Sequence, residues 1–125
     1  MIRAHGLGIP HRVAFSNGEH SAEADLPAAK GGAGLGFGPH DLLEAALATC
    51  MAITVEMYAA KHGIPLESVA AEVRLDRTDP DAVAVIYSMT FEGALTEEHR
   101  ESLQIAASKC PVQRTLAGRL SCREA

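Results

Sequence analysis

The chain has 125 residues, a length that fits one domain (residues 1–125) and excludes a two-domain enzyme with a separate cofactor module. Apolar residues make up 47% of the sequence, which is enough to build a core without disulfides or a structural metal. The formal charge of −5 and the lack of any run of Lys or Arg argue against nucleic acid as a partner.

A β-hairpin is predicted over residues 13–24, followed by a glycine-rich loop. Asn17-Gly18 tolerates the positive φ angles of a two-residue turn. Five glycines between Gly31 and Gly38 make the next stretch too flexible for a helix or strand. A phosphate-binding role for this loop is rejected because no βαβ pattern surrounds it. We expect it to form the wall of a pocket or to reach across a dimer.

An amphipathic helix is predicted from Asp41 to His62. Its apolar residues recur at steps of three and four, which is typical of one buried face. This stripe comprises Leu43, Ala46, Leu47, Cys50, Ile53, Thr54 and Met57. Gly63 can take the left-handed conformation that ends a helix, and Pro65 prevents its continuation. Cys50 is therefore expected to lie in the buried stripe.

A second hairpin and a second helix are predicted next. Alternating apolar residues indicate strands over residues 69–75 and 83–91, joined by a turn rich in aspartate. Thr96 suits the first position of a helix whose apolar stripe ends at Cys110, just before a proline. The tail over residues 115–122 is expected to supply a last short strand.

Two cysteines thus lie on helix faces that must be buried in one core. We expect these faces to pack against each other, so that Cys50 and Cys110 become neighbours. A Cα separation below about 7 Å permits a disulfide, and such a pair can reduce a hydroperoxide through a sulfenic acid. The alternative is that both cysteines are inert core residues. The pattern alone leaves both readings open.

The three cysteines and the start of the chain indicate a cytoplasmic protein. An odd number of cysteines in an apolar chain favours free thiols in a reducing compartment, and Cys122 is read as a small core residue. The first twelve residues lack the apolar region of a secretory signal, and no apolar run approaches the roughly 20 residues of a membrane-spanning helix. The scattered histidines give no support for a metal site.

Two cysteine motifs stand sixty residues apart. The first is GPHDLLEAALATCMAIT at residues 38–54, and the second is CPVQRTL at residues 110–116. Together with HSAEADLP at residues 20–27, they resemble the OsmC/Ohr family of osmotically inducible and organic-hydroperoxide-resistance proteins. His20 belongs to the upstream segment and is read as structural.

The resemblance implies a fold and an activity. The fold is α+β, with two antiparallel sheets or hairpins wrapped around two central helices in an intertwined homodimer whose active sites lie at the subunit interface. The activity is reduction of organic hydroperoxides and hydrogen peroxide, with Cys50 as the peroxidatic and Cys110 as the resolving cysteine. An external thiol or dithiol then reduces the pair, and no metal or organic cofactor is implied.

In the family an arginine and a glutamate accompany the peroxidatic cysteine. The acid here is Asp41, which alternatively caps the helix together with Glu44. Arg12 is the first choice for the arginine and Arg114 the second, with Arg3 a further substitute, and each is otherwise a surface charge. A cation matters because a buried thiol without one is expected to have a pKa above about 8.5.

Two functions remain open at this point. The first is a cysteine-based peroxidase that prefers bulky organic hydroperoxides, because burial of their alkyl groups is favourable. The second is a binding module or slow thiol switch on the same fold that has lost turnover. A Cys50 that reacts with a thiol reagent well below about pH 8 favours the enzyme.

Overall fold

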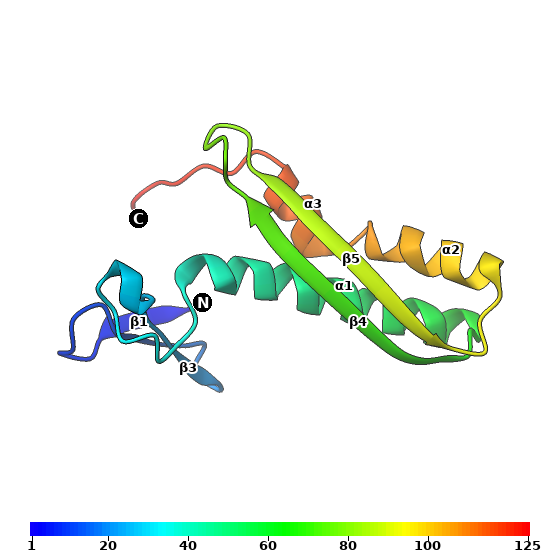
Figure 1. The fold of residues 1–125 in the computed structure, drawn as a ribbon, viewed down its shortest axis with the longest axis horizontal. Coiled ribbons are helices and arrows are strands. Elements are labelled where there is room, and N and C mark those ends of the chain that lie inside the picture. Colours follow the sequence, from blue (N-terminus) through cyan, green and yellow to red (C-terminus); the bar gives the residue numbers. More distant parts are fainter. The chain divides into compact units, whose positions relative to one another are not determined.

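Three α-helices and two antiparallel sheets make up the chain, and the computed structural model describes all 125 residues. In chain order the elements are β1 (Arg3–Gly6), β2 (Val13–Ser16), β3 (Ser21–Ala24), the 3-10 helix η1 (Ala28–Lys30), α1 (Pro39–His62), β4 (Leu66–Asp76), β5 (Ala84–Gly93), α2 (Glu97–Ala107) and α3 (Pro111–Ala117) (Figure 1). The predicted α+β class is confirmed. The chain divides into two compact units, Met1–Leu43 and Glu44–Ala125, which are described separately.

The first unit contains a three-stranded sheet in the order β1-β2-β3. The β2–β3 hairpin lies where it is predicted: Ser16 pairs with Ser21, and the N–H of Asn17 donates to the carbonyl oxygen of His20 at 3.2 Å, which leaves Gly18 and Glu19 at the tip. The Asn17 side chain accepts the backbone N–H groups of Glu19 and His20, at 2.9 and 2.8 Å, and so closes the turn. The turn is therefore one residue later than the predicted Asn17-Gly18, and of these two residues only Gly18 has a positive φ.

In the second unit, the β4–β5 hairpin lies across α1 (Figure 1). The strands pair in the predicted segments, and one apolar face of the hairpin packs on the helix. That face includes Val69, Ala71, Val73, Leu75, Val85, Tyr87, Met89 and Phe91. The period of two in the sequence therefore marks the side of the hairpin that faces the core.

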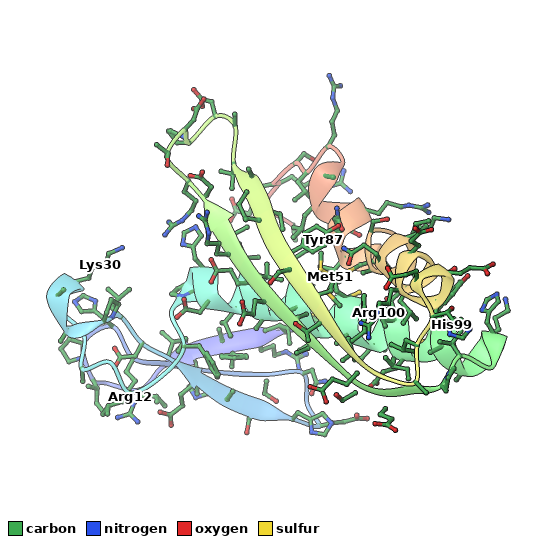
Figure 2. The ribbon with its side chains drawn as sticks, turned by 45° about the vertical axis from the view of Figure 1, so that its right-hand side comes forward. Arg12, Lys30, Met51, Tyr87, His99 and Arg100 are labelled. Carbon is green, nitrogen blue, oxygen red and sulfur yellow. The ribbon has the colours of Figure 1, made fainter.

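α1 buries a row of residues that shares only Leu47 with the predicted stripe. The residues with little or no exposure are Leu47, Met51, Val55 and Ala59. Figure 2 shows Met51 on α1 behind the hairpin. Ile53 and Met57, which the stripe includes, are 55% and 68% exposed. The stripe is wrong in part because α1 carries apolar residues on more than one side, so periodicity does not identify the face that meets the hairpin.

The ends of α1 follow the sequence signals. α1 ends at His62, and Gly63 takes a φ of 63°, as expected for a left-handed cap. By length and composition alone α1 is long and apolar enough to cross a membrane, contrary to the expectation that no such run exists. A single helix of this kind is weak evidence for a membrane span, because core helices of globular proteins meet the same criterion.

The C-terminal region differs from the prediction. α2 starts after Thr96, whose hydroxyl accepts the N–H of His99, as the capping residue should. α2 ends at Ala107, so Cys110 lies between two helices rather than on a helix face. The predicted last strand is wrong, since residues Pro111–Ala117 form α3. A proline fits the first turn of a helix because its fixed φ is helical and its missing N–H is not needed there.

Candidate functional site

The structure brings Cys50 and Cys110 into contact within one apolar cluster. Cys50 lies on α1 and is half-buried, while Cys110 directly precedes α3 and is fully buried. Leu47 and Met51 form the centre of this cluster with Cys110, and Cys50 packs against it. Neither sulfur is in a disulfide. The pair is thus placed for chemistry between the two sulfurs, with Cys50 the more accessible partner.

The surroundings of Cys50 favour its thiolate. Burial is the largest influence and raises the pKa of Cys50, but hydrogen bonds to the sulfur outweigh it and bring the pKa below the ordinary value of 9.0. The strongest of these comes from the Cys110 thiol, followed by the backbone N–H of Val112 and the hydroxyl of Thr54. All three donors are neutral. The expectation that a thiol without a cation has a raised pKa therefore does not hold for Cys50.

The surroundings of Cys110 have the opposite effect. Burial is the largest influence and raises the pKa of Cys110 above 9.0, and the hydrogen bond it gives to Cys50 raises the pKa further. The backbone N–H groups of Gln113 and Val112 oppose this increase only in part. The pair is therefore polarised, with Cys50 the first to ionise and Cys110 the proton donor between them.

Sequence reasoning missed three groups at this pair. Thr54 lies one helical turn after Cys50, and this spacing of four residues was a usable signal. The Val112 N–H reaches Cys50 only because the chain turns after α2, which no local pattern reveals. Gln113 carries the one buried side-chain oxygen or nitrogen without a hydrogen-bond partner, its Oε1. This free acceptor lies in the second cysteine motif.

A cavity of about 200 Å³ lies between α1 and α2 in the second unit. Its lining is mainly apolar, with a hydroxyl or ammonium group at several points. The lining residues are Thr54, Tyr58, Ser102, Ile105, Ala106 and Lys109. Thr54 lies one helical turn after Cys50, so the cavity lies beside the face of α1 that carries this cysteine. A cavity of this kind can take a small, mainly apolar group.

Arg12 lies in the first unit (Figure 2). It forms an ion pair with Glu23, with 2.6 Å between Nη2 and Oε2. Its Nε donates to the same oxygen at 2.8 Å, so two nitrogens of the guanidinium bind one carboxylate oxygen. The other arginine candidates, Arg3 on β1 and Arg114 on α3, are exposed. The acid that holds Arg12 is therefore Glu23.

Asp41 acts as a capping residue in the first turn of α1. Its Oδ2 accepts the N–H of Gly38, the residue before the helix, at 2.8 Å. Glu44 does not complete the predicted capping pattern, because its Oε1 accepts the N–H of Leu75 at 2.7 Å. Glu44 thus ties α1 to β4 in the second unit.

The remaining candidates from the sequence are peripheral. His20 is exposed in the β2–β3 loop, and Cys122 is exposed beyond α3, contrary to its reading as a core residue. No group of three or more histidine, cysteine, aspartate or glutamate side chains is close enough to hold a metal ion.

Comparison with known proteins adds a family to this geometry. Residues 31–124 match the sequence model of a family described as OsmC-like protein. No curated protein matches the sequence. An organic hydroperoxide resistance protein OsmC from Legionella pneumophila has a similar structure, with 26% identity, 94% of this chain and 88% of that chain covered, and a TM-score of 0.68.

Two further solved structures show the same fold. An OsmC-like protein from Mycoplasma pneumoniae is 21% identical, with 94% of this chain and 86% of that chain covered and a TM-score of 0.77. The organic hydroperoxide resistance protein OhrB of Bacillus subtilis is 23% identical, with coverages of 94% and 90% and a TM-score of 0.66.

Proposed function

Because the chain belongs to the OsmC-like protein family, we propose that it is a thiol-dependent peroxidase that uses Cys50 and Cys110 to reduce organic hydroperoxides and hydrogen peroxide. The observation that carries this proposal is the polarised pair, in which the more accessible sulfur is also the more acidic one. A peroxidatic cysteine must be both accessible and ionised, because the thiolate is the nucleophile. The resemblance to organic hydroperoxide resistance proteins supports the same substrate class.

The proposed reaction has two steps at the protein. The Cys50 thiolate attacks one oxygen of the peroxide, the O–O bond breaks, and the alcohol leaves with a proton while Cys50 becomes a sulfenic acid. Cys110 then attacks the Cys50 sulfur, water leaves, and a disulfide forms between the two residues. An external thiol or dithiol reduces this disulfide and restores both thiols.

The setting of the reaction is also part of the proposal. Free cysteines fit a reducing compartment, so we place the protein in the cytoplasm. We further propose a homodimer, since Ile53 and Met57 leave an exposed apolar strip on α1 and Ile105 leaves another on α2. Within the dimer, we propose that Arg12 supports the Cys50 thiolate. We propose that Asp41, which also caps α1, supports the arginine.

Peroxide consumption by cysteine variants tests this function. The wild-type protein with a dithiol should consume tert-butyl hydroperoxide faster than hydrogen peroxide, because the cavity lining is mainly apolar. Cys50→Ser should abolish consumption, and Cys110→Ser should allow one equivalent without the dithiol. The measurement is peroxide loss over time, with sulfenic acid trapped by dimedone in Cys110→Ser.

Cys122→Ser is the matched control, because this cysteine is exposed and lies outside the pair. It should leave the rate unchanged. A wild-type protein that consumes neither peroxide, with Cys50 unreactive toward thiol reagents, would instead favour a non-catalytic module on the same fold.

A further inference from the structure

Gln113 carries a buried side-chain oxygen that has no hydrogen-bond partner. Its Oε1 is shielded from solvent, and no donor of the chain reaches it. A buried polar atom without a partner destabilises a folded protein, and native proteins contain few of them. Such an atom is a candidate acceptor for a donor that is present only in another state of the protein.

The position of Gln113 in α3 relates this oxygen to the cysteine pair. α3 begins directly after Cys110. Two of its residues, Val112 and Leu116, pack against the cluster that contains Cys110 and Cys50. Gln113 follows Val112 and lies one helical turn before Leu116, so it shares the packed face of α3. The free oxygen is thus buried on the side of α3 that meets the cysteine cluster.

The groups around Gln113 leave its oxygen free. A glutamine three residues after the residue that precedes a helix often accepts the backbone N–H of that residue. Here this N–H belongs to Cys110, and it donates to the carbonyl oxygen of Ala107 at 3.2 Å. Apart from the two cysteines, the one polar side chain in the cluster is that of Tyr87, and its hydroxyl does not bind Gln113. The reduced chain therefore offers this oxygen no donor.

The proposed reaction adds one donor to this cluster. When a peroxide oxidises Cys50, the sulfur gains a hydroxyl group. Cys50 packs against side chains that are almost all apolar, and a hydroxyl there is destabilising unless an acceptor binds it. The reduced cluster thus has an acceptor without a donor at Gln113, and oxidation supplies a donor at Cys50.

We propose that Gln113 is a further catalytic residue of the peroxidase, whose Oε1 accepts the O–H of the Cys50 sulfenic acid and holds it for attack by Cys110. This inference rests on the proposed function. In the step that follows, the Cys110 sulfur forms the S–S bond and the S–O bond of the sulfenic acid breaks. The hydroxyl leaves as water with the proton of the Cys110 thiol. Gln113 is neither oxidised nor deprotonated, so it is unchanged for the next cycle.

Gln113→Met tests this inference, because methionine keeps the length of the side chain and removes the acceptor. All proteins carry Cys122→Ser, so that mass spectrometry after N-ethylmaleimide counts only the thiols of the pair. tert-Butyl hydroperoxide is raised until the rate of disulfide formation no longer increases. This limiting rate should fall about threefold to tenfold in Gln113→Met, the size expected for one lost hydrogen bond. Peroxide loss in the Cys110→Ser background reports the first step alone, and Gln113→Met should not change its rate.

Thermal stability separates this role from a structural one. The reduced Gln113→Met protein should have a higher midpoint of unfolding than its parent by circular dichroism, because the substitution removes an unpaired buried acceptor. If Gln113 only supported the packing of α3, its replacement would instead lower the midpoint and slow both steps.

Gln104→Met is the matched control, since it makes the same change at an exposed position of α2. It should leave both rates and the midpoint unchanged. The inference is overturned if Gln113→Met forms the disulfide at the parent's rate, slows both steps equally or melts below its parent. Should Gln113→Met fail to fold, Gln113→Leu serves in its place with the same expected rates.

The two proposals fail in different ways. A wild-type protein that consumes no peroxide overturns the proposed function, and this inference with it. An active wild-type protein beside a Gln113→Met protein with the same limiting rate of disulfide formation overturns this inference alone.

Discussion

Asp25 is the one charged side chain that is buried, with 2% of its surface exposed. Its carboxylate accepts the N–H groups of Leu26, Ala33 and Leu35 at 2.7, 3.2 and 3.1 Å. A side chain at Gly32 would collide with the Leu26 carbonyl, because its Cβ would lie 1.9 Å from that oxygen. The glycine-rich loop is therefore folded around a carboxylate, and it is not the featureless segment that five glycines suggest.

This arrangement fixes the pH range in which Asp25 stabilises the loop. The Leu35 N–H is the largest influence and lowers the pKa of Asp25 below 3.8, burial opposes it, and the remaining N–H donors and Arg12 lower the pKa further. A carboxyl group with a lowered pKa contributes stability above its ordinary value. That contribution is lost as the pH falls below 3.8 and passes through the pKa of the folded protein.

Asp25→Asn should lower the thermal midpoint of unfolding near neutral pH, because an amide offers one neutral acceptor where the carboxylate has two charged oxygens. The difference from wild type should shrink as the pH falls below 3.8, where Asp25 itself loses its charge. Circular dichroism melts from about pH 3 to pH 7 would measure this. Glu19→Gln, an exposed charge of the same unit, is the control and should show little change. A difference that is constant with pH would contradict the role of the charge.

At the scale of the elements, α1 shows how one helix can carry two apolar surfaces. The row with Leu47, Met51, Val55 and Ala59 packs into the second unit, and the strip with Ile53 and Met57 stays exposed. A helix that is apolar on more than one side is not explained by a single core contact. The two surfaces should therefore differ in how strongly they affect the stability of the folded chain.

Met51→Ala should reduce the free energy of unfolding by about 2–5 kcal/mol, because it leaves a cavity in a fully buried cluster. Thr49→Ala, on the exposed side of the same helix, should stay within about 0.5 kcal/mol of wild type. Urea denaturation followed by circular dichroism gives both values. A loss below about 0.5 kcal/mol for Met51→Ala, which is the range of surface substitutions, would mean that Met51 is not a core residue.

The long elements are predictable because each carries its own signal in the sequence. α1, α2 and the β4–β5 hairpin have periodic apolar residues, and the signals extend over ten or more residues. β1 has no such signal, since all of its residues are exposed and it exists by pairing with β2. α3 is too short for periodicity, and a proline marks the end of one helix as well as the start of the next.

The site is predictable to a smaller extent. The meeting of the two cysteines follows from the apolar surroundings of both motifs, but their unequal acidity does not. It depends on which thiol donates to the other and on the Val112 N–H, and both are set by the path of the chain between α2 and α3. Thr54 could have been identified from its spacing to Cys50.

At the scale of the whole molecule, the exposed apolar residues bear on the proposed dimer. Ile53→Glu should convert the dimer to a monomer, because a carboxylate would have to be buried at the interface without a partner. Size-exclusion chromatography with light scattering gives the mass. Gln104→Glu on α2 adds the same charge at an exposed polar position and should leave the dimer intact. A wild-type monomer, or an Ile53→Glu dimer, would contradict this assignment of the interface.

Cys122 adds a thiol to the segment after α3, where the chain has no regular secondary structure and the residue is exposed. In air, such a thiol is free to form an S–S bond with the same residue of another molecule. Two chains linked tail to tail in this way would run at twice the monomer mass on a non-reducing gel, whatever the state of α1. Noncovalent assembly is therefore best read from the Cys122→Ser protein or under reducing conditions.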